Sequence, residues 1–511
     1  MSPRSSRRRP SPRRRHASAR AREGIGEILQ LTVGEPAHGG ACVARDDSGR
    51  VVFVRHAAPG EVVRARVTAV QNKLAWADAV EILEPSPDRV ESVWPQAGPG
   101  GVGGGELAHL TPAAQREWKS RVIAGQLRRV GGEALAETVD ALGGVHVAPA
   151  PGDEEPNDPL TGRRSRIDLV IDADGHAGMH EFRGCRVIAL DDMPLAVPGI
   201  HELGLFDADS PWRRLWKPGD RVRAVAPSGG DPVVLIGDDT YAADGVRIDA
   251  DVLRWNVPVD SGVESYYVRP SGFWQTHVRG AEVLANAVLA AAFGSDEAGA
   301  GRAVMELYSG AGLFSVPLAR AVGESGRVVT LEGDEAAVRD AGENLAAFDW
   351  VDAFAGNVDR EGVVDLSGQL GAVPDVVVAD PPRAGAGAEV CEAIVATGTP
   401  RVVLVSCDPA AGVGPLPAYP PRGDGLGSEP LAGLPALKHA RAPRRLRARL
   451  NSTALIAVHA IHQIALGHPA NDTSINVHDR QSLQAGTAQR PENLGRRSGG
   501  SHGLVDERQI R

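Results

Sequence analysis

The apolar run RVVLVSC, residues 401–407, ends in a cysteine whose position favours chemistry. Asp408 and Pro409 follow Cys407 directly, and because proline cannot donate a strand hydrogen bond we expect the strand to stop there. A lone cysteine in an apolar strand is most often a small buried side chain. At a strand end, however, the sulfur faces a site, and a thiolate is a soft nucleophile suited to attack on an electron-poor carbon.

A second run with a polar end is DVVVAD, whose last residue is Asp380. Pro381, Pro382 and Arg383 follow it. This turn is rigid and has few hydrogen-bond donors. We interpret it as the surface beside which a flat base of the substrate lies. A dehydrogenase has no need of such a turn, so it favours a transferase that acts on a base.

A glycine-rich turn, Tyr308-Ser309-Gly310-Ala311-Gly312, follows the apolar run AVMEL, and Glu332 ends the next run about 20 residues further on. The missing side chains let the backbone approach a cofactor, and an acid at this spacing binds ribose hydroxyls. Nicotinamide and flavin enzymes share this pattern, and such a turn also serves tight packing alone. A later turn in AGNVD contributes Asn357.

These residues need a scaffold, and the sequence from about residue 271 onward predicts one. Short apolar runs alternate there with helical stretches, which indicates a parallel, doubly wound α/β sheet of the Rossmann-like kind. Ligands of such sheets bind at the carboxyl ends of the strands. The residues named above stand at those ends, so we expect them to share one site.

The preceding sequence predicts two other domains. Residues 26–83 alternate apolar and polar positions in short runs, which predicts a small all-β, OB-like barrel that binds RNA or serves only as a structural adaptor. A helical stretch from Ala113 to Val130 and strands at RIDLVID and RVIAL indicate an α+β domain of unassigned chemistry. We divide the chain into a basic disordered arm, the barrel, the α+β domain, the sheet domain and an atypical tail: residues 1–24, 25–86, 87–258, 259–411 and 412–511.

The net charge of −10 over 511 residues conceals two basic ends. Residues 1–22 hold nine arginines and no acid, a composition typical of a disordered tail that also attracts nucleic acid phosphates. The four scattered cysteines predict neither disulfides nor secretion and favour the reduced cytoplasm. No apolar run is long enough to span a membrane. We expect a cytoplasmic monomer.

Taken together, residues 26 to about 411 resemble the RNA (uracil-5-)-methyltransferase family, whose members use S-adenosylmethionine (SAM) and carry an N-terminal TRAM barrel. The similar motifs are GFWQ, ELYSGAGLF, DPPR and SCDP. The resemblance implies that Cys407 is the nucleophile. It also implies a cofactor site made of Gln275, Tyr308, Gly310, Gly312, Glu332, Asn357 and Asp380.

The implied reaction forms 5-methyluridine in ribosomal or transfer RNA. C5 of uracil is a weak nucleophile, so the thiolate adds to C6 and a base later removes the C5 proton. A small-molecule methyltransferase or a nucleotide-dependent oxidoreductase is a different interpretation, but it leaves the barrel and Cys407 without a role.

The sequence departs from the family pattern at two places. Many relatives hold an iron–sulfur cluster with closely spaced cysteines after the barrel. The corresponding stretch VWPQAGPGGVGGGELAHL has none, with Val102 and Gly105 among its glycines, so we expect no cluster and no other metal.

The second departure follows Ala411, where the family's closing strands and its His-His-Val-Glu segment, which carries the base, have no match. The change to proline, glycine and arginine resembles a reading-frame shift, or a divergent tail. Spacing alone does not identify a base among Glu429, Asp472 and Glu492. We expect an exposed sheet edge beside the Cys407 strand, with only Ser452 to Leu466 able to form a short element. An RNA-binding product with impaired catalysis is therefore the alternative function.

Overall fold

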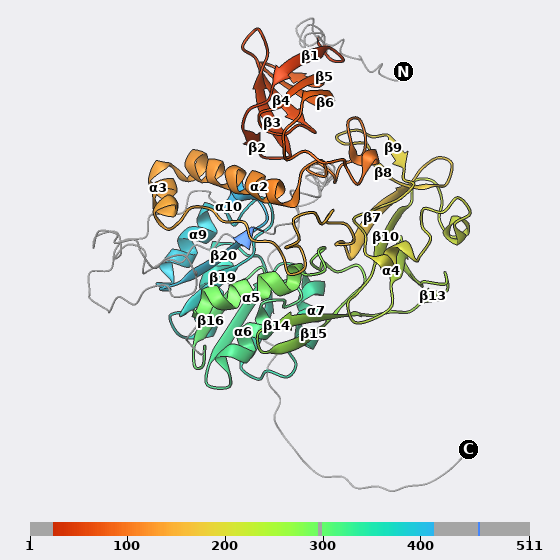
Figure 1. Ribbon diagram of the computed structural model, residues 1–511. Helices are drawn as coiled ribbons and strands as arrows, with labels where there is room; N and C mark the ends of the chain where they lie inside the picture. Colours follow the sequence, from red (N-terminus) through yellow and green to blue (C-terminus); the bar gives the residue numbers. More distant parts are fainter. Residues whose placement is uncertain (1–23, 295–298, 413–457, 460–511) are drawn as a thin grey trace, which may run out of the picture. The chain divides into compact units, whose positions relative to one another are not determined.

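The computed structural model describes residues 24–294, 299–412 and 458–459 (Figure 1). The predicted arm, residues 1–24, and the tail, residues 412–511, lie outside these ranges except for Gly24, Gly412 and Val458–His459. Within the described part, the strands form three sheets and one hairpin. None of the helices described there is both long and apolar enough to cross a membrane.

The N-terminal sheet has six strands in the order β1-β5-β6-β4-β3-β2. The strand β5 shows why it folds this way: alternate residues from Val63 to Val67 are buried, and the arginines between them are exposed. This period of two places one face of each strand on the core. The strands are β1 Ile28–Thr32, β2 Pro36–Ala37, β3 Ala41–Arg45, β4 Val51–Arg55, β5 Val62–Gln71 and β6 Leu74–Glu84.

A helical segment follows this sheet where the sequence predicted one. Helix α2, Pro112–Gln126, begins with a proline in its first turn, and the Thr111 hydroxyl accepts a hydrogen bond from the N–H of Ala114 at 3.3 Å. Its buried residues Trp118 and Val122 pack against the core of the N-terminal sheet. The wider turn Leu127–Gly131 and helix α3, Glu133–Ala141, continue the segment.

The central sheet has seven antiparallel strands in the order β13-β12-β11-β10-β7-β8-β9. The predicted strands RIDLVID and RVIAL correspond to β7 and β9. The short helix α4, Pro198–His201, contributes Ile200 to the core of this sheet. The strands are β7 Arg166–Ile171, β8 Ala177–His180, β9 Val187–Ala189, β10 Arg221–Val225, β11 Val233–Ile236, β12 Asp239–Ala242 and β13 Arg247–Ile248.

The C-terminal sheet is parallel, as the alternation of strands and helices predicted, with the order β18-β17-β16-β19-β20-β21. Its strands β16 and β19 are buried on both faces, which explains their continuous apolar runs. The strands are β16 Ala303–Leu307, β17 Arg327–Glu332, β18 Val351–Ala355, β19 Val376–Ala379, β20 Val402–Ser406 and β21 Val458–His459.

Successive residues of the parallel strands face two different cores. Val304 of β16 faces the core that includes residues of α5 and α6, and Met305 faces the core that includes residues of α8 and α9. The helices are α5 Gly280–Phe293, α6 Ser315–Val322, α7 Glu335–Asn344, α8 Arg360–Leu370 and α9 Gly387–Ala396. The sheet is therefore covered on both faces, as a doubly wound fold requires.

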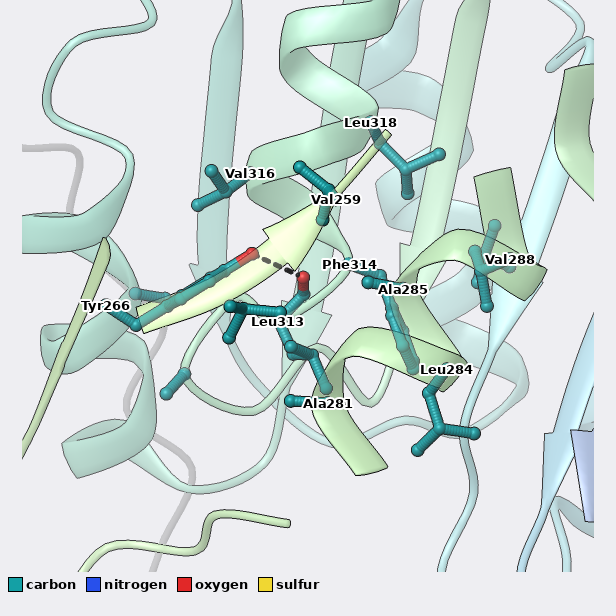
Figure 2. Close-up of a cluster of buried hydrophobic side chains, with 14 of the residues drawn as sticks. Val259, Tyr266, Ala281, Leu284, Ala285, Val288, Leu313, Phe314, Val316 and Leu318 are labelled. Carbon is teal, nitrogen blue, oxygen red and sulfur yellow. Dashed lines mark hydrogen bonds between the residues drawn. The ribbon is translucent and has the colours of Figure 1, made fainter. Parts of the chain in front are cut away.

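A hairpin packs next to the segment that follows the glycine-rich turn of this domain. Its strands are β14 Leu253–Val259 and β15 Gly262–Val268. Figure 2 shows the Tyr266 ring among side chains of α5 and α6, with its hydroxyl donating a hydrogen bond to the Leu313 carbonyl at 2.9 Å. Because this bond satisfies a fully buried hydroxyl, it fixes the segment that leads from the turn into α6.

The chain after Cys407 differs from the exposed edge that we expected. Helix α10, Pro409–Gly412, makes one turn, and the two-residue strand β21 pairs in parallel with β20 through Val405 and Ser406. β21 lies within the segment from Ser452 to Leu466. The edge beside β20 is thus covered over two residues of its length.

Candidate active site

Three of the predicted site residues follow neighbouring strands of the parallel sheet. The N–H of Tyr308, after β16, donates a hydrogen bond to the carbonyl of Leu331 on β17 at 2.8 Å. The N–H of Asp380, after β19, donates to the carbonyl of Leu307 on β16 at 3.3 Å. Backbone hydrogen bonds between adjacent strands therefore bring Tyr308, Glu332 and Asp380 to the same edge.

The glycine-rich turn is closed by the carboxylate of Glu332. One of its oxygens accepts the N–H of Gly310 at 2.9 Å, and the other accepts the N–H of Asp334 at 2.8 Å. Each carboxylate oxygen can accept two hydrogen bonds and here accepts one, so a lone pair remains on each oxygen for the hydroxyls of a ribose.

The backbone of this turn is open at Gly310. Gly310 and Gly312 have φ values of 54° and 89°, which residues other than glycine rarely adopt. A Cβ atom at Gly310 would meet no atom within 4 Å. Tyr308 also has a positive φ, of 62°, and such strain in a tyrosine is typical of functional sites. An open backbone beside an acid is the donor and acceptor set that a nucleoside cofactor requires.

The Asp380 carboxyl lies in an acidic environment. Burial, together with the neighbouring Glu332 carboxylate, raises the pKa of Asp380 to about 7. At neutral pH this group therefore exists in both protonation states, and it can accept or donate a hydrogen bond.

Glu306 is a site residue that the sequence analysis missed. It belongs to β16, is completely buried, and accepts a hydrogen bond from the Ser315 hydroxyl at 2.7 Å. Burial, followed by the charges of Asp380 and Glu332, raises the pKa of Glu306 to about 8. The raised pKa favours the protonated, neutral carboxyl at pH 7, and the hydrogen bond with Ser315 links β16 to the start of α6. The available signals were an acid inside the apolar run AVMEL and its place as the first residue of the motif ELYSGAGLF.

Cys407 follows β20 at the same edge and is partly exposed. Burial raises the pKa of the Cys407 thiol, and the positive charge of Arg383 lowers it. The negative charges of Asp380 and Asp408 also raise the pKa of the Cys407 thiol. The structure thus brings the cysteine near the DPPR turn, and Arg383 is the cation that favours the reactive thiolate.

His38, from the N-terminal sheet, contacts the residue next to the cysteine. Its Nε2 atom lies 3.2 Å from Oδ2 of Asp408. Burial opposes ionisation of Asp408, but the hydrogen bond and charge of His38 and the N–H groups of Ala410 and Ala411 lower its pKa to about 2. No sequence signal pointed to His38, because the two residues are far apart in the chain.

Asn357 and Gln275 are placed differently from the other predicted residues. Asn357 is exposed after β18, and the neighbouring Gly356 N–H donates to the Glu332 carbonyl at 2.9 Å, which brings this turn to the edge. Gln275 lines a pocket with Trp255, Trp274 and Glu282. Among the described residues, the lining of that pocket includes neither the glycine-rich turn nor Asp380. A cofactor role for Gln275 and Asn357 stays a prediction.

The residues of the loop expected to hold an iron–sulfur cluster in relatives do not fit one. Trp94, Ala97 and Val102 of this loop are buried in the core of the central sheet. A Cβ atom at Gly105 would lie 2.7 Å from the Ala97 Cβ, so even alanine is crowded there. The loop also lacks thiolate ligands, and we derive no chemistry from a cluster.

Comparison with known proteins identifies the N-terminal sheet and most of the rest of the chain. Residues 22–80 match the TRAM domain model. An uncharacterized RNA methyltransferase of Streptomyces avermitilis is 37% identical over 411 residues, covering 76% of this chain and 90% of the relative. A second one, from Streptomyces coelicolor, is 38% identical over 411 residues, covering 76% and 85%.

The chain belongs to the RNA (uracil-5-)-methyltransferase family. The resemblance seen in the sequence is thereby confirmed, and so is a multidomain architecture with a TRAM domain and a methyltransferase domain. A relative with a more specific name is the 23S rRNA (uracil(1939)-C(5))-methyltransferase RlmD of Halomonas elongata. It is 29% identical over 433 residues, covering 78% of this chain and 85% of the relative.

Proposed function

We propose that this methyltransferase methylates C5 of a uridine in RNA, with Cys407 as the covalent nucleophile. The observation that carries the proposal is the position of Cys407 at the carboxyl edge, within the electrostatic influence of Asp380 and Arg383. The Glu332-closed turn lies at the same edge. C5 methylation requires that the cofactor-binding residues and the nucleophilic thiol lie next to each other.

In the proposed reaction, Cys407 and the cofactor have separate roles. The Cys407 thiolate forms a bond to C6 of the uracil, and the ring electrons move to O4, so that C5 becomes nucleophilic. SAM supplies an electrophilic methyl group when bound. After C5 is methylated, a base accepts the C5 proton, the electrons of the broken C–H bond restore the C5–C6 double bond, and the thiolate leaves C6. The target base must leave its stack to reach the pocket.

We propose that Glu332 binds the ribose of SAM and that Tyr308, Gly310 and Gly312 border its methionine part. Asp380, with its raised pKa, holds a polar group of the cofactor or of the uracil. Gln275 and Asn357 complete the site if they move toward it on binding.

For the wider function we propose ribosomal or transfer RNA as the substrate, in keeping with the name of the Halomonas relative. The six-stranded TRAM sheet would act as an OB-like module for single-stranded RNA. We also propose that the protein works as a cytoplasmic monomer without an iron–sulfur cluster, with the domain boundaries predicted above.

Transfer of tritium from [methyl-³H]SAM to unmodified RNA tests this function. We expect labelled 5-methyluridine with the parent protein and none with Cys407→Ala. Cys391→Ala is the matched control, because Cys391 is also a partly exposed free cysteine of the same domain. Equal transfer by Cys407→Ala and the parent would overturn the assignment of the nucleophile.

A second candidate is an RNA-binding protein with impaired turnover. It is favoured by one observation: after β20 the described residues add only the single turn α10 and the two-residue β21. In that case RNA and SAM bind, but no 5-methyluridine forms.

A further inference from the structure

A histidine of the TRAM sheet lies beside the residue that follows the proposed nucleophile. His38 belongs to the turn between β2 and β3, and its Nε2 atom lies 3.2 Å from Oδ2 of Asp408. Asp408 is the next residue after Cys407, and its charge acts on the Cys407 thiol. The TRAM sheet therefore contributes an imidazole to the surroundings of the nucleophile.

Local structure holds the turn that carries His38 in a defined position. β2 and β3 pair as far as Ala37 and Ala41, so residues 38–40 form the whole loop of a hairpin. Gly39 and Gly40 have φ values of 87° and 76°, the left-handed conformation that such a short loop requires. Helix α2 contacts both β2 and α10. One helix thus links this hairpin to the segment that follows the nucleophile.

The contact with Asp408 determines which nitrogen of His38 can accept a proton. Oδ1 of Asp408 accepts the N–H groups of Ala410 and Ala411 at 2.8 and 3.3 Å, which leaves Oδ2 for His38. An ionised carboxylate only accepts hydrogen bonds, so the hydrogen of the uncharged imidazole lies on Nε2 and Nδ1 keeps its lone pair. Within the described part of the chain, Nδ1 has no hydrogen-bond partner.

The proposed reaction needs a proton acceptor close to the nucleophile. In the adduct, C6 carries the Cys407 sulfur and C5 is bonded to C6, so the C5 proton must be removed near that sulfur. The charged groups that act on the Cys407 thiol are Arg383, Asp380 and Asp408. A guanidinium accepts no proton, and the lowered pKa of Asp408 makes it a weak base. His38 and Asp380 therefore remain as candidates.

Two other histidine–aspartate contacts show what a purely structural version looks like. Nδ1 of His201 lies 3.2 Å from Oδ1 of Asp192, and its Nε2 contacts a backbone carbonyl at 3.1 Å, so both nitrogens are engaged. Nδ1 of His176 lies 3.4 Å from Oδ2 of Asp172, within a single turn of the central sheet. Neither aspartate is next to a cysteine in the sequence. His38 differs in its open nitrogen and in its place beside the nucleophile.

We propose that His38 is the general base that removes the C5 proton, with Asp408 as its positioning residue. The inference rests on the proposed function and names the group that completes its last step. Nδ1 of His38 takes the proton, the electrons of the C5–H bond form the C5–C6 double bond, and the electrons of the C6–S bond return to Cys407 as a thiolate. Asp408 stabilises the imidazolium that forms. The His38 side chain is 41% exposed, so the proton then passes to water.

Single-turnover reaction of the full chain with [methyl-³H]SAM and ordinary uridine-containing RNA tests the proposal. In His38→Ala, methyl transfer should proceed, but release of the methylated RNA should slow by about a hundredfold or more. A tritium-labelled, denaturation-resistant protein–RNA adduct should then accumulate on Cys407, and imidazole added to the solution should speed its release. His176→Ala is the matched control, because His176 is similarly exposed and also contacts an aspartate, and it should release product at the rate of the parent.

RNA that contains 5-fluorouridine separates this role from a structural one. Its trapping needs the thiolate and methyl transfer but no base, so His38→Ala should form the trapped adduct at the rate of the parent. Release of 5-methyluridine RNA by His38→Ala at the parent's rate overturns the proposal. Equal slowing of trapping and release also overturns it, because a base acts only on release.

The parent protein distinguishes failure of this inference from failure of the proposed function. A parent that traps 5-fluorouridine but releases no 5-methyluridine would show that His38 is not a base, while Cys407 remains the nucleophile. A parent that forms no adduct with SAM and RNA bound would overturn the proposed function and this inference with it. Accumulation of the adduct in Asp380→Asn at saturating SAM, with normal release by His38→Ala, would assign the proton to Asp380 instead.

Discussion

The carboxyl edge of the parallel sheet has two halves that differ in how completely they are built. The cofactor half lies at the ends of β17, β16 and β19, where β16 pairs with β17 over five residues and with β19 over four. The nucleophile half follows β20, which pairs with β19 over three residues and with β21 over two. Strand pairing therefore fixes Glu332 and Asp380 more firmly than Cys407.

The residues that we propose for cofactor binding and the proposed nucleophile are therefore held in place by different contacts. The hydrogen bonds from Gly310 and Asp334 to Glu332 are made within the cofactor half. Cys407 depends on contacts from the DPPR turn and, through Asp408, on His38. Asp380 belongs to both halves, because its charge also raises the pKa of Cys407. Substitutions of the other residues in one half should leave the readout of the other half unchanged.

The largest effect is expected in the cofactor half, from Glu332→Ala. Loss of a carboxylate that accepts hydrogen bonds from the turn, and that we propose binds ribose hydroxyls, should weaken SAM binding by about tenfold to a hundredfold, corresponding to about 1.5–3 kcal/mol. Isothermal titration calorimetry measures this, with Glu335→Ala in the first turn of α7 as the control. Unchanged SAM affinity would remove Glu332 from the cofactor site.

Glu306→Gln should change stability in a pH-dependent way. The folded state raises the pKa of Glu306 from 4.5 to about 8, so it holds a proton that the unfolded chain releases. The stability of the parent therefore falls as pH rises from about 4.5 to 8, and glutamine, which carries no charge, avoids this loss.

Thermal unfolding at several pH values tests this prediction. We expect the melting temperature of Glu306→Gln to exceed that of the parent by a few degrees at pH 8, about 1–2 kcal/mol, and by less at pH 5. A constant difference across this range would show that folding does not raise the pKa of Glu306.

Arg383→Gln should affect the nucleophile half alone. Removing the positive charge that lowers the Cys407 pKa should raise that pKa further, so a smaller fraction of thiolate is present at pH 8. We expect alkylation of Cys407 by iodoacetamide to slow several-fold, with the pH profile displaced upward and SAM affinity unchanged. A profile identical to that of the parent would contradict the role given to Arg383.

The smallest effect on stability is expected from His38→Gln. The side chains of His38 and Asp408 are 41% and 23% exposed, so their ion pair contributes about 1 kcal/mol or less. The lowered pKa of Asp408 stabilises the fold above pH 3.8, and this contribution disappears as pH falls toward 2. Acid unfolding of the variant should therefore begin at a slightly higher pH than that of the parent.

Most of the fold was predictable because its strands carry clear periodicities. The run DVVVAD indicated a strand buried on both faces, and β19 is buried throughout. Alternation in residues 26–83 likewise predicted the strands of the TRAM sheet. The covered edge at β21 was not predictable, since two residues carry no periodic signal.

The site was predictable where the topology alone brings residues together. Asp380, Glu332 and Cys407 end parallel strands, and such ends must meet at one edge. The raised pKa of Glu306 was not predictable, because it depends on burial, and the sequence shows only that the residue is an acid. His38 was missed because its contact with Asp408 depends on the arrangement of two domains.

Covalent trapping with RNA that contains 5-fluorouridine tests the central claim most directly. Fluorine at C5 cannot leave as a proton, so the adduct persists after methyl transfer whether or not a base is present. With SAM bound, the account predicts a denaturation-resistant protein–RNA adduct that peptide mapping places on Cys407. An adduct on another residue, or none while SAM and RNA are both bound, would contradict it.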